Sequence, residues 1–184
     1  MRMRIISGDL KGRLINVPKS NKIRPTTDRV RETLFNLLNN IIDITGIKVL
    51  DLYAGSGSLG LECLSRGASE IHFIEKDFFI YKNLIKNIQS LDSERHCTVI
   101  KMDAVKYTEN TADFFYDLVI ADPPFFKEDI YRVVKNILNN NYLHKSSLMI
   151  IERSVQTKEK DIGNFNIDPF KIIGDTCLYS IKLK

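Results

Sequence analysis

The amino-acid sequence predicts an α/β protein: a Rossmann-like, doubly wound, mostly parallel seven-stranded sheet with an antiparallel last strand, preceded by a small N-terminal β-hairpin. Apolar runs of strand length alternate with segments of helical periodicity through the 184 residues, which is typical of parallel sheets covered on both faces. A glycine-rich turn directly follows the strand predicted at 47–52. The strand candidates 168–174 and 177–183 have no helix between them, which indicates the antiparallel end. We assign residues 1–22 to a basic hairpin extension and residues 23–184 to the main domain.

The N-terminal segment predicts the hairpin and one helix. Between residues 3 and 17, two runs with β-branched side chains flank the turn residues 9–12. A basic loop is expected at 20–24, and Thr26 or Thr27 can cap the helix that follows. We expect this helix to pack on the sheet edge, because its apolar residues share one face: Val30, Leu34, Leu37, Leu38 and Ile41.

The rest of the chain alternates between strands and helices. The expected strands lie at 70–74, 98–102, 117–121 and 147–152, and the expected helices at 58–66, 77–91 and 127–139. Gly67 is placed to end the first of these helices in the left-handed conformation.

The segment from Val49 to Glu62 combines a strand, a glycine loop and the start of a helix. Its glycines have the G-x-G-x-x-G spacing, which nicotinamide dinucleotides and S-adenosylmethionine both use. Asp51, four residues before the first glycine, favours S-adenosylmethionine, because a carboxylate repels a pyrophosphate but suits the ammonium group of a methionine moiety. The simpler alternative is that Asp51 caps the following turn or helix.

Acidic residues end four successive predicted strands. Besides Asp51 these are Glu75, Asp103 and Asp122, and ligands of open α/β sheets bind beyond such strand ends. Glu75 lies twenty residues after Gly55, a spacing that suits hydrogen bonds to ribose hydroxyls. Asp103 can accept a hydrogen bond from the adenine amine. A surface carboxylate and a helix N-cap are the respective alternatives.

The tetrad Asp122-Pro123-Pro124-Phe125 suits methylation of an exocyclic amine on a planar heterocycle. Two prolines fix the backbone, so a carbonyl can point into a site, and Phe125 can stack on a base. If Asp122 and the Pro123 carbonyl accept hydrogen bonds from the amine, the nitrogen lone pair is directed at the methyl group. Alternatively, the tetrad is a turn with Phe125 in the core.

These segments resemble class I S-adenosylmethionine-dependent methyltransferases and, more closely, the bacterial 16S ribosomal RNA guanine-N2 methyltransferases. The resemblance is carried by RIISGDLKGR, RPTTDRVRETLFNLL, LDLYAGSGSLGLECLSRGA, FIEKD and ADPPF, and it covers nearly the whole chain. Tyr53 and Ser58 replace the phenylalanine and alanine that are commoner in the family, and the tail GDTCLYSIKL is only loosely similar.

The resemblance implies S-adenosyl-L-methionine as cofactor, 16S ribosomal RNA within a small-subunit particle as partner, and guanine N2 as target. The implied catalytic residues are Asp122, Pro123, Pro124 and Phe125. The implied cofactor-binding residues are Asp51, Ala54, Gly55, Ser56, Gly57, Glu75, Lys76, Asp103 and Ala104.

Charge is unevenly distributed. Residues 1–31 hold nine Lys and Arg against two Asp, a net charge of +7, so with +4 overall the remaining residues carry −3. A basic end suggests a polyanionic partner, although a solvated charged surface would look the same. We assign RNA binding to Arg4, Lys11, Arg13, Arg24, Arg29 and Arg31. The target base would have to be unstacked to enter the pocket.

Other features limit the function classes. The three cysteines are isolated, which favours free thiols, and neither they nor the histidines have metal-ligand spacing. We expect no membrane span and no signal peptide, and a cytoplasmic monomer. The rival functions are amino methylation of DNA or of protein glutamine, a non-catalytic RNA-binding assembly factor, and a nicotinamide oxidoreductase.

Overall fold

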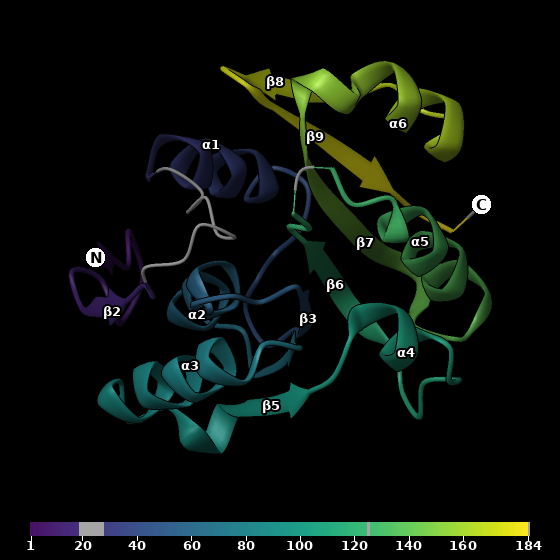
Figure 1. Cartoon of the computed structure of the whole chain (residues 1–184). Helices are drawn as coiled ribbons and strands as arrows, with labels where there is room; N and C mark the ends of the chain where they lie inside the picture. The colour runs from purple at the N-terminus through teal and green to yellow at the C-terminus, as the bar shows by residue number, and fades with distance from the viewer. Residues whose placement is uncertain (19–27, 125, 184) are drawn as a thin grey trace.

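The computed structural model describes residues 1–18, 28–124 and 126–183. Its centre is a seven-stranded sheet in the order β5-β4-β3-β6-β7-β9-β8 (Figure 1). The first five strands of this order are parallel, and β9 runs antiparallel to both of its neighbours. The strands are β3 (Lys48–Leu52), β4 (Glu70–Glu75), β5 (Cys97–Lys101), β6 (Tyr116–Ala121), β7 (Leu143–Ser154), β8 (Lys171–Ile173) and β9 (Thr176–Ile181). The predicted sheet and its antiparallel end are confirmed.

Helices cover both faces of this sheet, because neighbouring strand residues point to opposite sides. Val49 and Leu50 illustrate this, since each belongs to a different buried cluster. The Val49 cluster holds side chains of the hairpin, α1 (Asp28–Leu38), α2 (Ser58–Ser65) and α3 (Phe78–Ser90). The Leu50 cluster holds side chains of α4 (Ala104–Thr108), α5 (Asp129–Asn139) and α6 (Lys158–Phe165). Short 3-10 turns occur at Glu94–His96 and Val155–Thr157.

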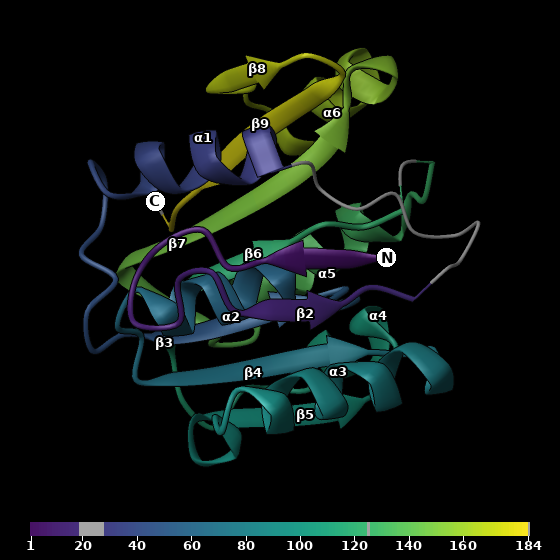
Figure 2. The same ribbon diagram turned by 90° about the vertical axis from the view of Figure 1, so that its left-hand side faces the viewer.

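The N-terminal hairpin is confirmed, with strands shorter than predicted. β1 (Arg2–Arg4) pairs with β2 (Leu14–Asn16), and Met3 faces Ile15. Both of these side chains enter the Val49 cluster, so the hairpin shares the core of the main domain. In Figure 2 the hairpin lies across α2 on one face of the sheet.

Polar contacts hold the hairpin on α2. The fully buried Glu62 carboxylate accepts hydrogen bonds from the Ile6 and Ser7 amides, at 2.8 and 3.1 Å. The Leu10 amide donates to Ser65 Oγ at 2.9 Å. Gly8 has a φ of +81°, and a Cβ added there would lie 1.7 Å from the Ser65 carbonyl oxygen. Only glycine fits at this contact.

Several boundaries differ from the sequence prediction. Helix α1 ends at Leu38, so Ile41 lies beyond it and is 43% exposed, while Phe35 and Arg31 are buried in its place. Side chains of α1 share a cluster with residues of β6 and β7, so the helix covers the face of the sheet and not its edge. Helices α4 and α6 were not predicted. The expected loop at 20–24 and the capping threonines lie outside the described residues.

Helix α2 ends as predicted. Gly67 has a φ of +103°, its amide donates to the Leu64 carbonyl at 3.0 Å, and the Ala68 amide donates to the Cys63 carbonyl at 3.1 Å. This pair of bonds is the Schellman arrangement that satisfies the last carbonyls of a helix. Within the described residues, no helix is both long and apolar enough to cross a bilayer.

Candidate active site

The four predicted acidic residues lie together at the carboxyl ends of the parallel strands. Strands β5, β4, β3 and β6 are adjacent and parallel, so their carboxyl ends lie side by side. Asp51 lies in β3, Glu75 ends β4, Asp103 follows β5 and Asp122 follows β6. Leu52 pairs with both Ile74 and Ala121, so Asp51, Glu75 and Asp122 lie at the carboxyl ends of three adjacent strands.

Asp51 holds the first turn of α2, directly after the glycine loop. It is 2% exposed, and its Oδ2 accepts a hydrogen bond from the Gly60 amide at 2.9 Å. Gly60 permits this approach, since an added Cβ would lie 2.3 Å from a ring carbon of Phe73. Burial raises the pKa of Asp51 well above its ordinary value; the Gly60 amide opposes this shift, and Asp122 and Glu75 reinforce it.

Glu75, at the end of the neighbouring strand β4, holds the glycine loop itself. Its Oε2 accepts from the Gly55 amide at 3.0 Å, and its Oε1 accepts from the Asp77 amide at 2.8 Å. The carboxylate therefore fixes both the loop and the start of α3. Each oxygen keeps a further lone pair for a ligand.

The loop is shaped to hold a ligand with its backbone. Gly55 and Gly57 have φ of +57° and +82°, and nothing lies closer than 3.8 Å to a Cβ built on Gly55. The Ala54 amide donates to the Ile74 carbonyl at 3.0 Å, and the Ser56 carbonyl accepts from Asn87 at 2.9 Å. The space beside Gly55 and the two carboxylates beneath the loop fit the methionine and ribose parts of S-adenosylmethionine.

Asp103 is the N-cap of α4. Its Oδ1 accepts from the Val105 amide at 3.0 Å, and its Oδ2 lies 3.6 Å from Nζ of Lys76. Ala104, the first residue of α4, is buried. Asp103 is therefore a helix N-cap, which was the simpler interpretation of its sequence position. A hydrogen bond to an adenine amine would be an additional contact.

The tetrad follows β6 at the same end of the strands. Asp122 is half-buried, Pro123 is buried and Pro124 is exposed. The Pro124 carbonyl accepts a hydrogen bond from the Lys127 amide at 3.0 Å, which closes the turn. Phe125 lies outside the described residues. Because β6 pairs with β3 through Ala121 and Leu52, the tetrad stands directly beside the glycine loop.

Two site neighbours were not predicted. Tyr53, between β3 and the glycine loop, has a positive φ of 60° and a half-buried side chain. Its pKa is raised, first by burial and then by the carboxylate of Asp129. Asp129 in turn accepts a hydrogen bond from Lys127 Nζ at 3.1 Å. A polar aromatic directly before the loop is the only sequence signal for this contact.

The basic residues have unequal positions. Arg4, Lys11, Arg13 and Arg29 are exposed, and Arg13 donates to the Ser90 carbonyl at the end of α3. Arg31 is fully buried and donates to the Arg4 carbonyl at 2.7 Å and to Asp28 at 2.9 Å. Burial lowers its pKa. Arg31 thus joins α1 to the hairpin and does not reach solvent phosphates, contrary to our assignment.

Arg24, the remaining predicted arginine, lies outside the described residues.

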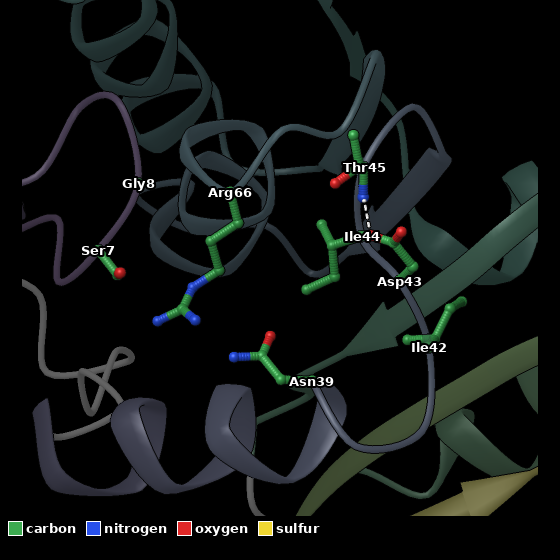
Figure 3. Close-up of a pocket in the computed structure, with 8 residues that line it drawn as sticks. All are labelled: Ser7, Gly8, Asn39, Ile42, Asp43, Ile44, Thr45 and Arg66. Atoms are coloured by element: carbon green, nitrogen blue, oxygen red, sulfur yellow. Dashed lines mark hydrogen bonds between the residues drawn. The ribbon is translucent and has the colours of Figure 1, made fainter.

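A separate pocket of about 450 Å³ lies at the opposite end of the strands, next to the residues that precede β3 (Figure 3). Figure 3 shows the Arg66 side chain pointing into it between Ser7 and Asn39. No residue predicted for the active site lines this pocket.

Comparison with known proteins places the chain in a family. The family model described as conserved hypothetical protein 95 matches residues 3–182. Ribosomal RNA small subunit methyltransferase D of Escherichia coli K12 is 35% identical over 94% of this chain and 85% of its own. The protein of the same name from Haemophilus influenzae is 40% identical, over 82% of this chain and 78% of its own.

Solved structures agree with this assignment. A putative methyltransferase of Escherichia coli, yhhF, superposes with a TM-score of 0.81 and 32% identity, with complete coverage of both chains. The T. thermophilus 16S rRNA N2 methyltransferase RsmC, solved with AdoMet and guanosine, shares the fold. Its TM-score is 0.72 and its identity 18%, over 100% of this chain and 50% of that one. The chain therefore belongs to the family of conserved hypothetical protein 95, with the small-subunit ribosomal RNA methyltransferases D as its relatives, and has the class I methyltransferase fold.

Proposed function

We propose that this protein transfers a methyl group from S-adenosyl-L-methionine to the exocyclic N2 amine of one guanine in 16S ribosomal RNA. The main support for the proposal is the position of the tetrad that begins at Asp122. It follows β6 directly beside the glycine loop, and the carboxylates of Asp51 and Glu75 hold this loop and the start of α2. The names of the curated relatives give the substrate class, and the resemblance of the tetrad gives the amine.

The cofactor would lie along the carboxyl edge of β3, β4 and β5. Asp51 would face the methionine ammonium, Glu75 the ribose and Asp103 the adenine amine. The loop residues Ala54 to Gly57, together with Lys76 and Ala104, would surround these groups. When bound, the sulfonium supplies a methyl group that a nitrogen lone pair can displace.

The tetrad would prepare the amine for this displacement. A guanine amine is a poor nucleophile, because its lone pair is delocalised into the ring. Hydrogen bonds from the amine to the Asp122 carboxylate and the Pro123 carbonyl draw the nitrogen toward tetrahedral geometry. The amine nitrogen would take the methyl group that the cofactor supplies, S-adenosylhomocysteine would be the leaving product, and Asp122 or solvent water would accept the proton that the nitrogen loses. Stacking on Phe125 would hold the flipped base.

The basic hairpin would supply the docking surface for RNA. Arg4, Lys11, Arg13, Arg24 and Arg29 would contact phosphates, which gives affinity that depends on salt and on RNA shape. We retain residues 1–22 as an RNA-contacting extension and propose a cytoplasmic monomer that acts on a small-subunit particle.

Nucleoside mass spectrometry of 16S ribosomal RNA tests the proposal. RNA from cells with and without this protein is digested and compared. We expect one N2-methylguanosine per 16S molecule to disappear and to return when the purified protein and S-adenosylmethionine are added. Identical nucleoside profiles would overturn the proposed substrate.

A further inference from the structure

The first turn of α3 displays two adjacent phenylalanines to solvent. Phe78 is 45% exposed and Phe79 is 79% exposed, and their ring centroids are 5.7 Å apart with an interplanar angle of 73°. Neither side chain belongs to the Val49 cluster or the Leu50 cluster. An exposed aromatic pair of this kind on a protein surface indicates a binding surface.

Lysines surround this pair. The Lys82 ammonium lies 4.6 Å from the Phe78 ring centroid, and the Lys101 ammonium lies 5.2 Å from it on the side of β5. Lys86 is exposed one turn further along α3, and residues 78–90 contain no acidic residue. The patch thus combines aromatic faces with fixed positive charge.

The patch is rigidly connected to the candidate active site. Asp77 caps α3 by accepting from the Phe79 amide at 2.9 Å and the Ile80 amide at 3.2 Å. The Asp77 amide donates to Glu75, whose other oxygen holds Gly55. The cap uses the Asp77 carboxylate, so its charge faces the helix backbone.

The other end of α3 carries the basic hairpin. The Asn16 carbonyl accepts from the side chains of Asn83 and Asn87, at 2.7 and 2.9 Å, and Arg13 donates to the Ser90 carbonyl. Helix α3 therefore links the positive hairpin to the mouth of the glycine loop. A polyanion bound to the hairpin would be led along Lys86 and Lys82 to the two rings.

We propose that Phe78 and Phe79, with Lys82 and Lys101, form a platform on which an unpaired base of the substrate RNA stacks while the lysines hold its flanking phosphates. This inference deepens the proposed function and rests on it. RNA is recognised in this way, since unpaired bases stack on aromatic rings beside positive charge. A second copy of the chain fits poorly, because lysines would face lysines across a symmetric contact.

Tryptophan fluorescence tests the platform directly, since the chain contains no tryptophan. The Phe79→Trp variant places one indole on the platform, and Phe115→Trp, at a residue 50% exposed before β6, is the matched control. An unmodified 16S transcript should quench the first indole and not the second, and a fully paired RNA duplex should quench neither. Unchanged Phe79→Trp fluorescence at saturating transcript, or equal quenching by the duplex, would overturn the platform.

Binding measurements give a second test. Phe79→Ala should weaken transcript affinity about tenfold, Phe79→Tyr should restore it, and affinity for S-adenosylmethionine should not change. Lys82→Ala should reduce the salt slope by about 0.7, whereas Lys135→Ala, on the exposed face of α5, should not. A wild-type protein that methylates the transcript while Phe79→Ala binds it equally well refutes only the platform. A wild-type protein that transfers no methyl group refutes the proposed function.

Discussion

The amide nitrogen of Gly55 lies 3.0 Å from Oε2 of Glu75, so the acid at the end of β4 holds the glycine loop that follows β3. The same carboxylate fixes the start of α3 through the Asp77 amide. A residue assigned to ribose binding therefore also sets the shape of the loop.

Replacing Glu75 with alanine tests both of these roles. Two amides lose a charged acceptor, so affinity for S-adenosylmethionine should fall at least about tenfold. Calorimetric titration measures this, with Glu94→Ala, in the exposed turn Glu94–His96, as control. S-Adenosylhomocysteine should also lose its advantage over its dideoxyribose analogue in the variant. An unchanged advantage would remove Glu75 from the ribose site and leave it only the loop.

The raised pKa of Asp51 predicts pH-dependent cofactor binding. Asp51 must be ionised to face an ammonium group, so affinity should fall as the pH is lowered through its raised pKa. In the absence of cofactor, the folded state keeps this proton to a higher pH than the unfolded state. Asp51 therefore contributes stability below its ordinary pKa of 3.8 that is lost as the pH rises toward the raised value.

Calorimetry in buffers of different ionisation enthalpy tests this linkage. We expect proton release on cofactor binding by the wild-type protein, and weak, nearly pH-independent binding by Asp51→Asn. The same proton release in both proteins would assign the titration to another group.

Gly8 should be irreplaceable where the hairpin meets α2. An alanine Cβ would overlap the Ser65 carbonyl at 1.7 Å, so Gly8→Ala should destabilise the fold by more than about 4 kcal/mol or detach the hairpin. Gly12 is the matched control, because its φ of +83° is similar and no atom lies within 4 Å of the added Cβ. Gly12→Ala should cost only about 1–2 kcal/mol. Equal losses in urea unfolding would show that backbone strain, and not the contact with Ser65, is decisive.

Charge reversal at the hairpin should weaken RNA binding. Arg4 and Lys11 are exposed, and the ion pair of the Arg4 guanidinium with Asp28, 3.9 Å apart, lies at the surface, where such pairs contribute little to stability. The double change to Glu should therefore leave the fold largely intact. Affinity for a 16S transcript should drop, and the plot of log affinity against log salt should flatten by about 0.7 for each lost phosphate contact. The same reversal at Lys135 and Lys171, exposed on α5 and β8, is the control. Equal effects of the two pairs would mean that the hairpin is not the docking surface.

The sequence was informative where chemistry and periodicity coincide. Acids at strand ends, the glycine spacing and the alternation of strands predicted the sheet and the strand ends at which the candidate site lies. The partners of those acids were not predictable, since the Gly60 amide reaches Asp51 only after α2 packs on β3. The simpler interpretation of Asp51 and Asp103 as caps is correct for their hydrogen bonds, because each carboxylate accepts from an amide in the first turn of a helix.

The burial of charged side chains was also not predicted from the sequence. Arg31 occurs in a basic segment, and its pairing with Asp28 three residues earlier is local, but its hydrogen bond to the carbonyl of Arg4, 27 residues away, is not revealed by any local pattern. Helix α6 was missed because KEKDIGNF has a weak apolar face; the buried ion pair of Arg153 and Asp161, at 3.1 Å, holds it to β7 instead.

In the proposed mechanism, Asp122 aims an aromatic amine at a methyl donor held by the neighbouring loop. The most direct measurement uses the Asp122→Asn variant, with cofactor binding by calorimetry and transfer of labelled methyl groups to unmodified 16S RNA followed in parallel. We predict that the variant binds S-adenosylmethionine within about threefold of wild type, because the loop is held by Asp51 and Glu75, and that methyl transfer falls at least about a hundredfold. Transfer at the wild-type rate with normal binding would contradict the account.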